Sequence, residues 1–114
     1  MFEYTISFKG KNFDAVNCFA TTKLHVEKVF NAGETKQKIA GNYDFGYLRL
    51  SGEDLASMLE EVSDLYTQHK GYIDEVEVEV TYFYGNQCNL EFSKNEIDAL
   101  NKLEANLSIT CVKE

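Results

Sequence analysis

Hydrophobic and polar residues alternate in several parts of the chain, and this period of two predicts β-strands that bury one face. Between Phe2 and Phe8 every second residue is hydrophobic, and Gly10 ends the pattern. Further strands, some with less regular alternation, are expected at residues 24–30, 44–50, 72–84, 88–92 and 107–111.

Hydrophobic residues recur three and four positions apart after Asp54, which predicts an amphipathic helix with one buried stripe. The stripe consists of Leu55, Met58, Leu59, Val62, Leu65 and Tyr66. Ser51 and Asp54 approximate a capping box before this helix, and Lys70 followed by Gly71 is a typical helix end.

Two shorter helices are expected, one on each side of the long one. The first follows Asn12, and the second follows Ser93, which forms an S-x-x-E capping box with Glu96. Ile97, Leu100 and Leu103 mark the second helix.

The order of these elements predicts an α+β fold: a single domain over residues 1–114, with an antiparallel sheet of about five or six strands and helices packed on one face. A chain of 114 residues suits one domain, and a hydrophobic content of 44% is sufficient for a core. Because no apolar run could span a membrane and the N-terminus has no signal-peptide pattern, we expect the protein in the cytoplasm.

A hairpin is predicted where Gly-Asn follows the strand at 72–84. Pairing Tyr84 with Cys88 through a three-residue turn keeps the hydrophobic residues of both strands on one face, whereas a two-residue turn mixes valine with glutamate. The favoured register places Glu91 next to Glu79 and leaves Phe83 on the same polar face.

Charge is distributed unevenly along the chain. The net charge is −8, yet residues 1–52 carry five acids and seven bases, residues 53–98 carry twelve acids and two bases, and residues 99–114 are balanced. An acidic surface of this kind repels phosphate backbones, so we expect no direct nucleic-acid binding. It attracts basic proteins and also promotes solubility.

Two acidic surfaces are candidates for partner binding. Glu75, Glu77 and Glu79 share one side of a strand; this side either faces water or docks Lys and Arg side chains together with exposed aromatic rings. The candidate residues near the sheet are Asp74, Glu75, Glu77, Glu79, Glu91, Phe83 and Tyr72. The candidates on the polar face of the long helix are Glu53, Glu60, Glu61 and Asp64.

Catalytic and metal-binding patterns are weak, so we expect no enzyme activity, no cofactor and no metal site. His25 and His69 are the two histidines, and no local motif links either to a cysteine. The three cysteines have no C-x-x-C spacing and are expected to be small buried hydrophobic residues. Alternating carboxylates on a strand lack the turn that would wrap ligands around a cation.

The C-terminal stretch YFYGNQCNLEFSKNEIDALNKLEANLSI, residues 82–109, is similar to the strand–strand–helix–strand ending of small bacterial domains, some of which occur near toxin genes. In its acidity and architecture the chain resembles bacterial immunity proteins of contact-dependent or polymorphic toxin systems. This resemblance implies a basic partner, often a nuclease, whose active site is blocked by acidic side chains. It assigns no catalytic residue.

Two alternatives remain open from the sequence. A phage-encoded inhibitor of a host defence protein could use the same acidic surface to mimic nucleic acid. A small enzyme or ligand-binding domain would instead need a pocket between sheet and helices, containing His25 or a cysteine. The oligomeric state is not indicated by the sequence.

Overall fold

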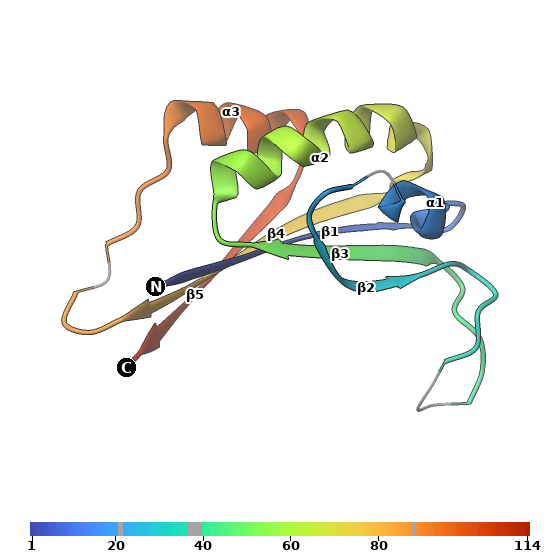
Figure 1. The fold of residues 1–114 in the computed structure, drawn as a ribbon, viewed down its shortest axis with the longest axis horizontal. Coiled ribbons are helices and arrows are strands. Elements are labelled where there is room, and N and C mark those ends of the chain that lie inside the picture. Colours follow the sequence, from blue (N-terminus) through green and yellow to red (C-terminus); the bar gives the residue numbers. More distant parts are fainter. Residues whose placement is uncertain (21, 37–39, 88) are drawn as a thin grey trace.

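Five β-strands form one sheet in the described part of the chain, and the helices lie against one face of this sheet (Figure 1). The structure is a computed structural model that describes residues 1–20, 22–36, 40–87 and 89–114. In chain order the elements are β1 (Phe2–Gly10), α1 (Ala15–Phe19), β2 (His25–Phe30), β3 (Gly46–Gly52), α2 (Leu55–His69), the 3-10 turn η1 (Lys70–Tyr72), β4 (Glu75–Tyr84), α3 (Lys94–Lys102) and β5 (Asn106–Lys113). The predicted α+β class is confirmed.

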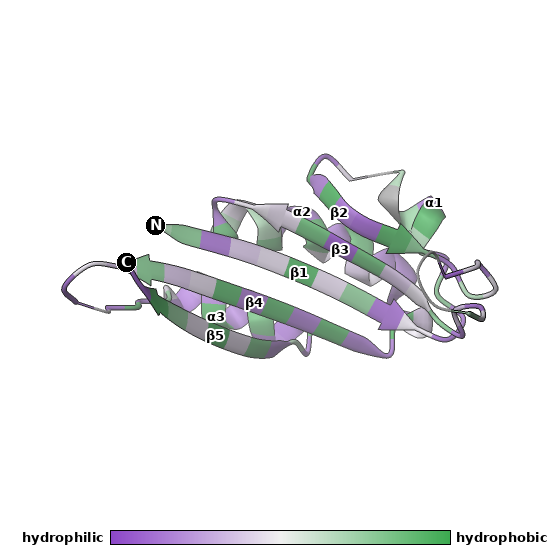
Figure 2. Ribbon diagram, turned by 90° about the horizontal axis from the view of Figure 1, so that it is seen from below, coloured by the Kyte–Doolittle hydropathy of each residue, from purple (hydrophilic) through white to green (hydrophobic). Residues whose placement is uncertain are grey.

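The strands lie in the order β2-β3-β1-β4-β5, and all neighbours are antiparallel except β4 and β5, which are parallel. The central strand β1 therefore pairs on both sides, with Ile6 opposite Leu50 of β3 and Val78 of β4. Because side chains alternate across a strand, this register places hydrophobic residues of three strands on the helix side. Polar residues alternate with them along the strands, as the colours of Figure 2 show, and by the same alternation they belong to the helix-free side.

The core lies between the sheet and the helices. All six residues of the predicted α2 stripe are buried, so that prediction is confirmed. They pack in one cluster with β1, β3, β4 and buried residues of α1 and α3. Each large side chain removed from water in this way contributes about 1.5–3 kcal/mol, which is why the stripe determines the position of α2.

The helix starts differ from two of the sequence expectations. Asp54, and not Ser51, caps α2, because its carboxylate accepts a hydrogen bond from the backbone N–H of Ser57. Similarly, Asp14 caps α1 by accepting from Asn17 N–H. The capping box predicted for α3 is confirmed.

The predicted hairpin after β4 is wrong. The described residues between 85 and 93 form no strand, and Cys88 lies outside the described residues. The chain continues instead through α3 and returns as β5, which pairs with β4 over eight positions, from Glu77–Asn106 to Tyr84–Lys113. A parallel neighbour needs such a helical crossover. The second strand of the predicted hairpin, residues 88–92, would have paired with β4 over five residues at most. Phe92 of this segment packs against the core instead.

Two hydrophobic positions near the C-terminus are exposed, and one of them, Cys111, was predicted to be buried. Ile97 of α3 is 55% exposed, whereas Leu100 and Leu103 are buried. Cys111 of β5 is exposed, as are all eight residues of this edge strand. Cys18 of α1 is buried, as expected.

The backbone just before α1 lies very close to the first residue of β3. A Cβ atom added at Gly46 would lie 2.0 Å from the carbonyl oxygen of Phe13, a distance that real Cβ atoms do not reach. Glycine at this position therefore allows the buried Phe13 to pack at the end of β3.

Candidate functional site

An acidic stripe, defined here as Glu75, Glu77 and Glu79, runs along β4 on the helix-free face of the sheet. Its position follows from the alternation that buries Val76, Val78 and Val80 on the opposite face. The three glutamates thus share one side of the sheet, as the sequence predicted. Glu75 is exposed, whereas Glu77 and Glu79 are only half-exposed.

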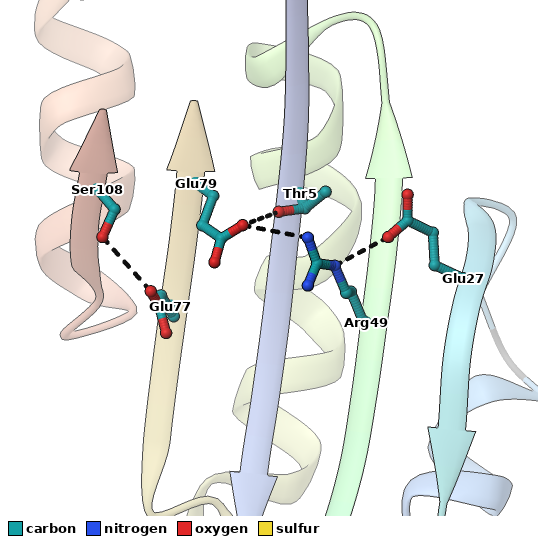
Figure 3. A network of polar contacts seen from close by, with 6 residues as sticks. All are labelled: Thr5, Glu27, Arg49, Glu77, Glu79 and Ser108. Atoms are coloured by element: carbon teal, nitrogen blue, oxygen red, sulfur yellow. Dashed lines mark hydrogen bonds and ion pairs between the residues drawn. The ribbon is translucent and has the colours of Figure 1, made fainter. Parts of the chain in front are cut away.

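Arg49 of β3 neutralises one end of the acidic stripe (Figure 3). Its Nη2 atom lies 3.1 Å from Oε2 of Glu79, across the intervening strand β1, and its Nε atom lies 2.8 Å from Oε2 of Glu27 on β2. The contact with Glu27 is a charge pair without hydrogen-bond geometry at Nε. Burial acts to lower the pKa of Arg49, but Glu79, Tyr47 and Glu27 outweigh it and raise this pKa.

The rest of the stripe also has neighbours within the protein. Thr5 donates a hydrogen bond to Glu79 at 3.3 Å, and Ser108 of β5 donates one to Glu77 at 3.4 Å (Figure 3). Lys9 is the cross-strand partner of Glu75. Among the described residues, Glu79 is thus the one member of the stripe in an ion pair, whereas Glu77 has a neutral hydrogen-bond donor and Glu75 has a lysine on the neighbouring strand.

A second acidic surface lies in a groove between α2 and α3, here called the interhelical groove, with a volume of about 630 Å³. Its carboxylates are Glu60 and Asp64 from α2 and Glu96 and Asp98 from α3, and Lys102 is the cation in its lining. The remaining lining residues are Ala56, Leu59, Ser63, Asn95 and Ala99. The groove thus combines an apolar floor with four carboxylates and one ammonium group.

Local sequence explains how the groove carboxylates are positioned. Glu60 and Asp64 are four residues apart, so they lie on the same side of α2. Glu96 accepts a hydrogen bond from the backbone N–H of Ser93 at 2.8 Å, which holds its side chain at the start of α3. The pKa of Tyr4 is raised first by burial and then by the charges of Glu96 and Asp54.

The other predicted sheet residues are not gathered at the acidic stripe. Glu91 lies in the connection between β4 and α3, so its predicted place beside Glu79 is wrong. Asp74 precedes β4 and accepts a hydrogen bond from Lys11 N–H at 2.9 Å.

The two aromatic candidates are separated along β4. Tyr72 is 58% exposed in η1, before the strand begins. Phe83 lies on the helix-free face near the other end of β4, opposite Val112, and is half-buried. The structure therefore does not form one aromatic and acidic docking patch from Tyr72, Phe83 and the stripe.

The helix candidates divide into two groups. Glu60 and Asp64 line the interhelical groove, whereas Glu61 accepts a hydrogen bond from Lys23 N–H at 3.0 Å on another side of α2. Glu53 is exposed just before α2. Only part of the predicted acidic helix surface therefore belongs to the groove.

Glu96 and Asp98 were missed as site residues. Both acids lie in the first turns of the capped helix at residues 94–102, but they are two residues apart, so no single periodic face of this helix marks them as a pair. Whether they meet the acids of α2 depends on how the two helices pack, which local periodicity does not specify.

Nucleophilic and metal chemistry have little support in the described residues. Burial, and to a smaller extent Asp14, raises the pKa of the Cys18 thiol to about 11, which keeps it protonated at neutral pH. His25 is exposed on β2, and the ring of His69 contacts Phe13 edge-on with a centroid separation of 6.1 Å. Within residues 1–20, 22–36, 40–87 and 89–114, no three His, Cys, Asp or Glu side chains gather to hold a metal ion.

Comparison with protein-family models, with curated proteins and with solved structures found no match. Among the described helices, none is long and apolar enough to cross a membrane.

Proposed function

We propose that this chain is an acidic, non-enzymatic binding protein of the cytoplasm that neutralises a basic protein by docking it in the interhelical groove. The observation that carries the proposal is the composition of this groove, in which Glu60, Asp64, Glu96 and Asp98 surround an apolar floor beside a single ammonium group. We further propose that the partner is a bacterial toxin and that the chain acts as its immunity protein.

The shape and chemistry of the groove suit Lys and Arg side chains. Their aliphatic stems pack well on apolar surface, such as that of Ala56 and Ala99, while their cationic heads remain near carboxylates. Carboxylates from two helices also allow charge-assisted hydrogen bonds from more than one direction, which improves specificity as well as affinity.

The acidic stripe is a weaker candidate for the same role. Glu79 already pairs with Arg49, so a partner's cation would have to compete with an existing ion pair. Glu60 and Asp64 form no ion pair with a Lys, Arg or His side chain among the described residues. These like charges, four residues apart on one helix, cost about 0.2–0.5 kcal/mol of helix stability, which is consistent with a surface kept for binding.

The electrostatic field of the whole molecule supports capture of a basic partner. A net charge of −8 on 114 residues increases the rate of encounter with cationic proteins, and this increase falls with ionic strength. In the immunity role, occupation of the groove would place the bulk of the chain over the toxin's active site and block it by occlusion.

A pair of matched variants tests the proposal. The groove variant is Glu60→Gln/Asp64→Asn, and the stripe variant is Glu75→Gln/Glu77→Gln; each removes two negative charges, so both have the same net charge. Each is co-expressed with the product of the gene directly upstream, which is where the immunity role places the gene of a basic toxin, and cell growth is measured. Association rates of the purified proteins are then measured at low and high salt.

We expect the groove variant to lose growth protection and to associate at least tenfold more slowly at low salt, whereas the stripe variant behaves like the wild type. Equal loss in both variants would show that net charge acts without a localised site. Full protection by the groove variant would refute the groove, and failure of the wild type to bind or protect would refute the immunity role.

A further inference from the structure

Strand β5 forms an edge of the sheet that nothing in the described chain covers. It lies outermost in the strand order, and all eight of its residues are exposed. Large hydrophobic residues are among them: Leu107 is 41% exposed and Ile109 is 45% exposed. A long edge with exposed hydrophobic residues is a template for pairing with another strand.

The opposite edge, β2, has the features that prevent such pairing. It is six residues long, its register shifts at a bulge between Val26 and Lys28, and it carries charged side chains, including Glu27. Bulges and edge charges both block the approach of a further strand. In contrast, β5 pairs with β4 without a register shift and carries no charge before Lys113.

The backbone of β5 offers its hydrogen bonds at the same residues that carry the exposed hydrophobic side chains. Glu114 N–H donates to Tyr84 O at 2.9 Å, so even-numbered residues direct their backbone groups toward β4. Because these groups alternate between the two edges of a strand, Leu107, Ile109 and Cys111 direct theirs outward. The same three residues pair with Val78, Val80 and Tyr82, so their side chains lie on the helix side of the sheet.

A second copy of this chain fits this edge, because the edge is self-complementary in its hydrophobic residues and lacks the repelling charge of the rest of the surface. Two copies with a net charge of −8 each repel one another over most of their surface. Residues 99–114 are the exception, since they contain two acids and two bases, and no acid lies between residues 105 and 113. The β5 edge is thus a place where two copies can meet without opposing carboxylates along the strand.

We propose that two copies of the chain pair antiparallel along β5, with a twofold axis at Ile109, and so join their sheets into one continuous sheet. This register places Ile109 opposite its own copy and Leu107 opposite Cys111 on the helix side, so hydrophobic residues face each other throughout. A shift by two residues would bring Lys113 opposite Leu107, which is less favourable. The proposal does not depend on the function proposed for the interhelical groove.

The oligomeric state tests this pairing directly. Sedimentation and light scattering over the micromolar to millimolar range should give about twice the chain mass of 13.0 kDa for the wild type. Ile109→Lys should give the monomer mass, because it places two like charges together at the axis. Val16→Lys is the matched control, since Val16 on α1 is 41% exposed and the charge change is identical; it should remain dimeric.

A disulfide variant tests the register. In the Cys111→Ser background, Ile109→Cys should form a 109–109 intermolecular disulfide on mild oxidation, because directly opposite residues in such a pair have Cα atoms about 5.5 Å apart. Peptide mapping identifies this bond.

A wild type that is monomeric throughout the concentration range would overturn the proposal. So would an Ile109→Lys variant that stays dimeric, and absence of the 109–109 crosslink would refute the register. The groove variant Glu60→Gln/Asp64→Asn should remain dimeric, which separates this result from that of the proposed function.

Discussion

Replacing Arg49 by methionine tests whether the acidic stripe is internally balanced. The substitution retains a hydrophobic stem on β3 but removes the two ion pairs, at 2.8 Å to Glu27 and 3.1 Å to Glu79. All three side chains are 35–40% exposed, so water screens both pairs, and exposed pairs contribute about 0.2–1 kcal/mol each. We therefore expect the free energy of unfolding to fall by about 1 kcal/mol.

Urea denaturation at low salt measures this loss, and a double-mutant cycle with Glu79→Gln isolates the cross-strand pair. We expect a coupling energy of about 0.5 kcal/mol between Arg49 and Glu79. The coupling should shrink in about 1 M salt, where the Debye length is about 3 Å. A coupling energy of zero at low salt would refute the idea that Arg49 neutralises the stripe.

The same variant also separates the two acidic surfaces as binding sites. If a basic partner docks in the interhelical groove, Arg49→Met should leave its affinity nearly unchanged, because Arg49 lies on the helix-free face. Markedly tighter binding would show that the partner uses the stripe and that Arg49 competes with it.

Two further predictions concern packing and thiol chemistry. Gly46→Ala should lower the free energy of unfolding by more than about 2 kcal/mol, because the added Cβ would collide with the Phe13 carbonyl. Gly71→Ala is the control, since its added Cβ meets open space and the change should be nearly neutral. Urea denaturation compares the two variants, and equal midpoints would contradict this reasoning. At pH 8 a thiol reagent should modify the exposed Cys111 and spare Cys18 until urea unfolds the chain, because a pKa of about 11 leaves roughly one Cys18 side chain in a thousand as thiolate. Peptide mapping locates the label, and rapid labelling of Cys18 in the folded protein would disprove this reasoning.

Local pattern was a good guide to the elements that bury a regular face. The α2 stripe and the alternation in β1 and β4 are specified by the side chains themselves, because each buries a continuous hydrophobic face. The hairpin after β4 failed for a non-local reason. Two later segments, residues 88–92 and β5, both alternate, and the longer pairing of β5 with β4 prevailed.

The candidate site was only partly predictable. The acids of α2 and their common side were readable from their spacing, but the groove also requires Glu96 and Asp98, which approach through the packing of α3 on α2. Likewise, the stripe was read correctly from β4, whereas its neutralisation by Arg49 depends on β3 lying one strand away across β1.

The order of residues alone was sufficient for the α+β class, the buried stripe of α2, the shared side of Glu75, Glu77 and Glu79, and the uneven charge, because these features arise between near neighbours in the chain. Tertiary packing decided which acids meet, which are neutralised, and which strand is left at the edge. Those outcomes depend on competition among segments far apart in the chain for the same neighbour, and local periodicity does not rank such competitors.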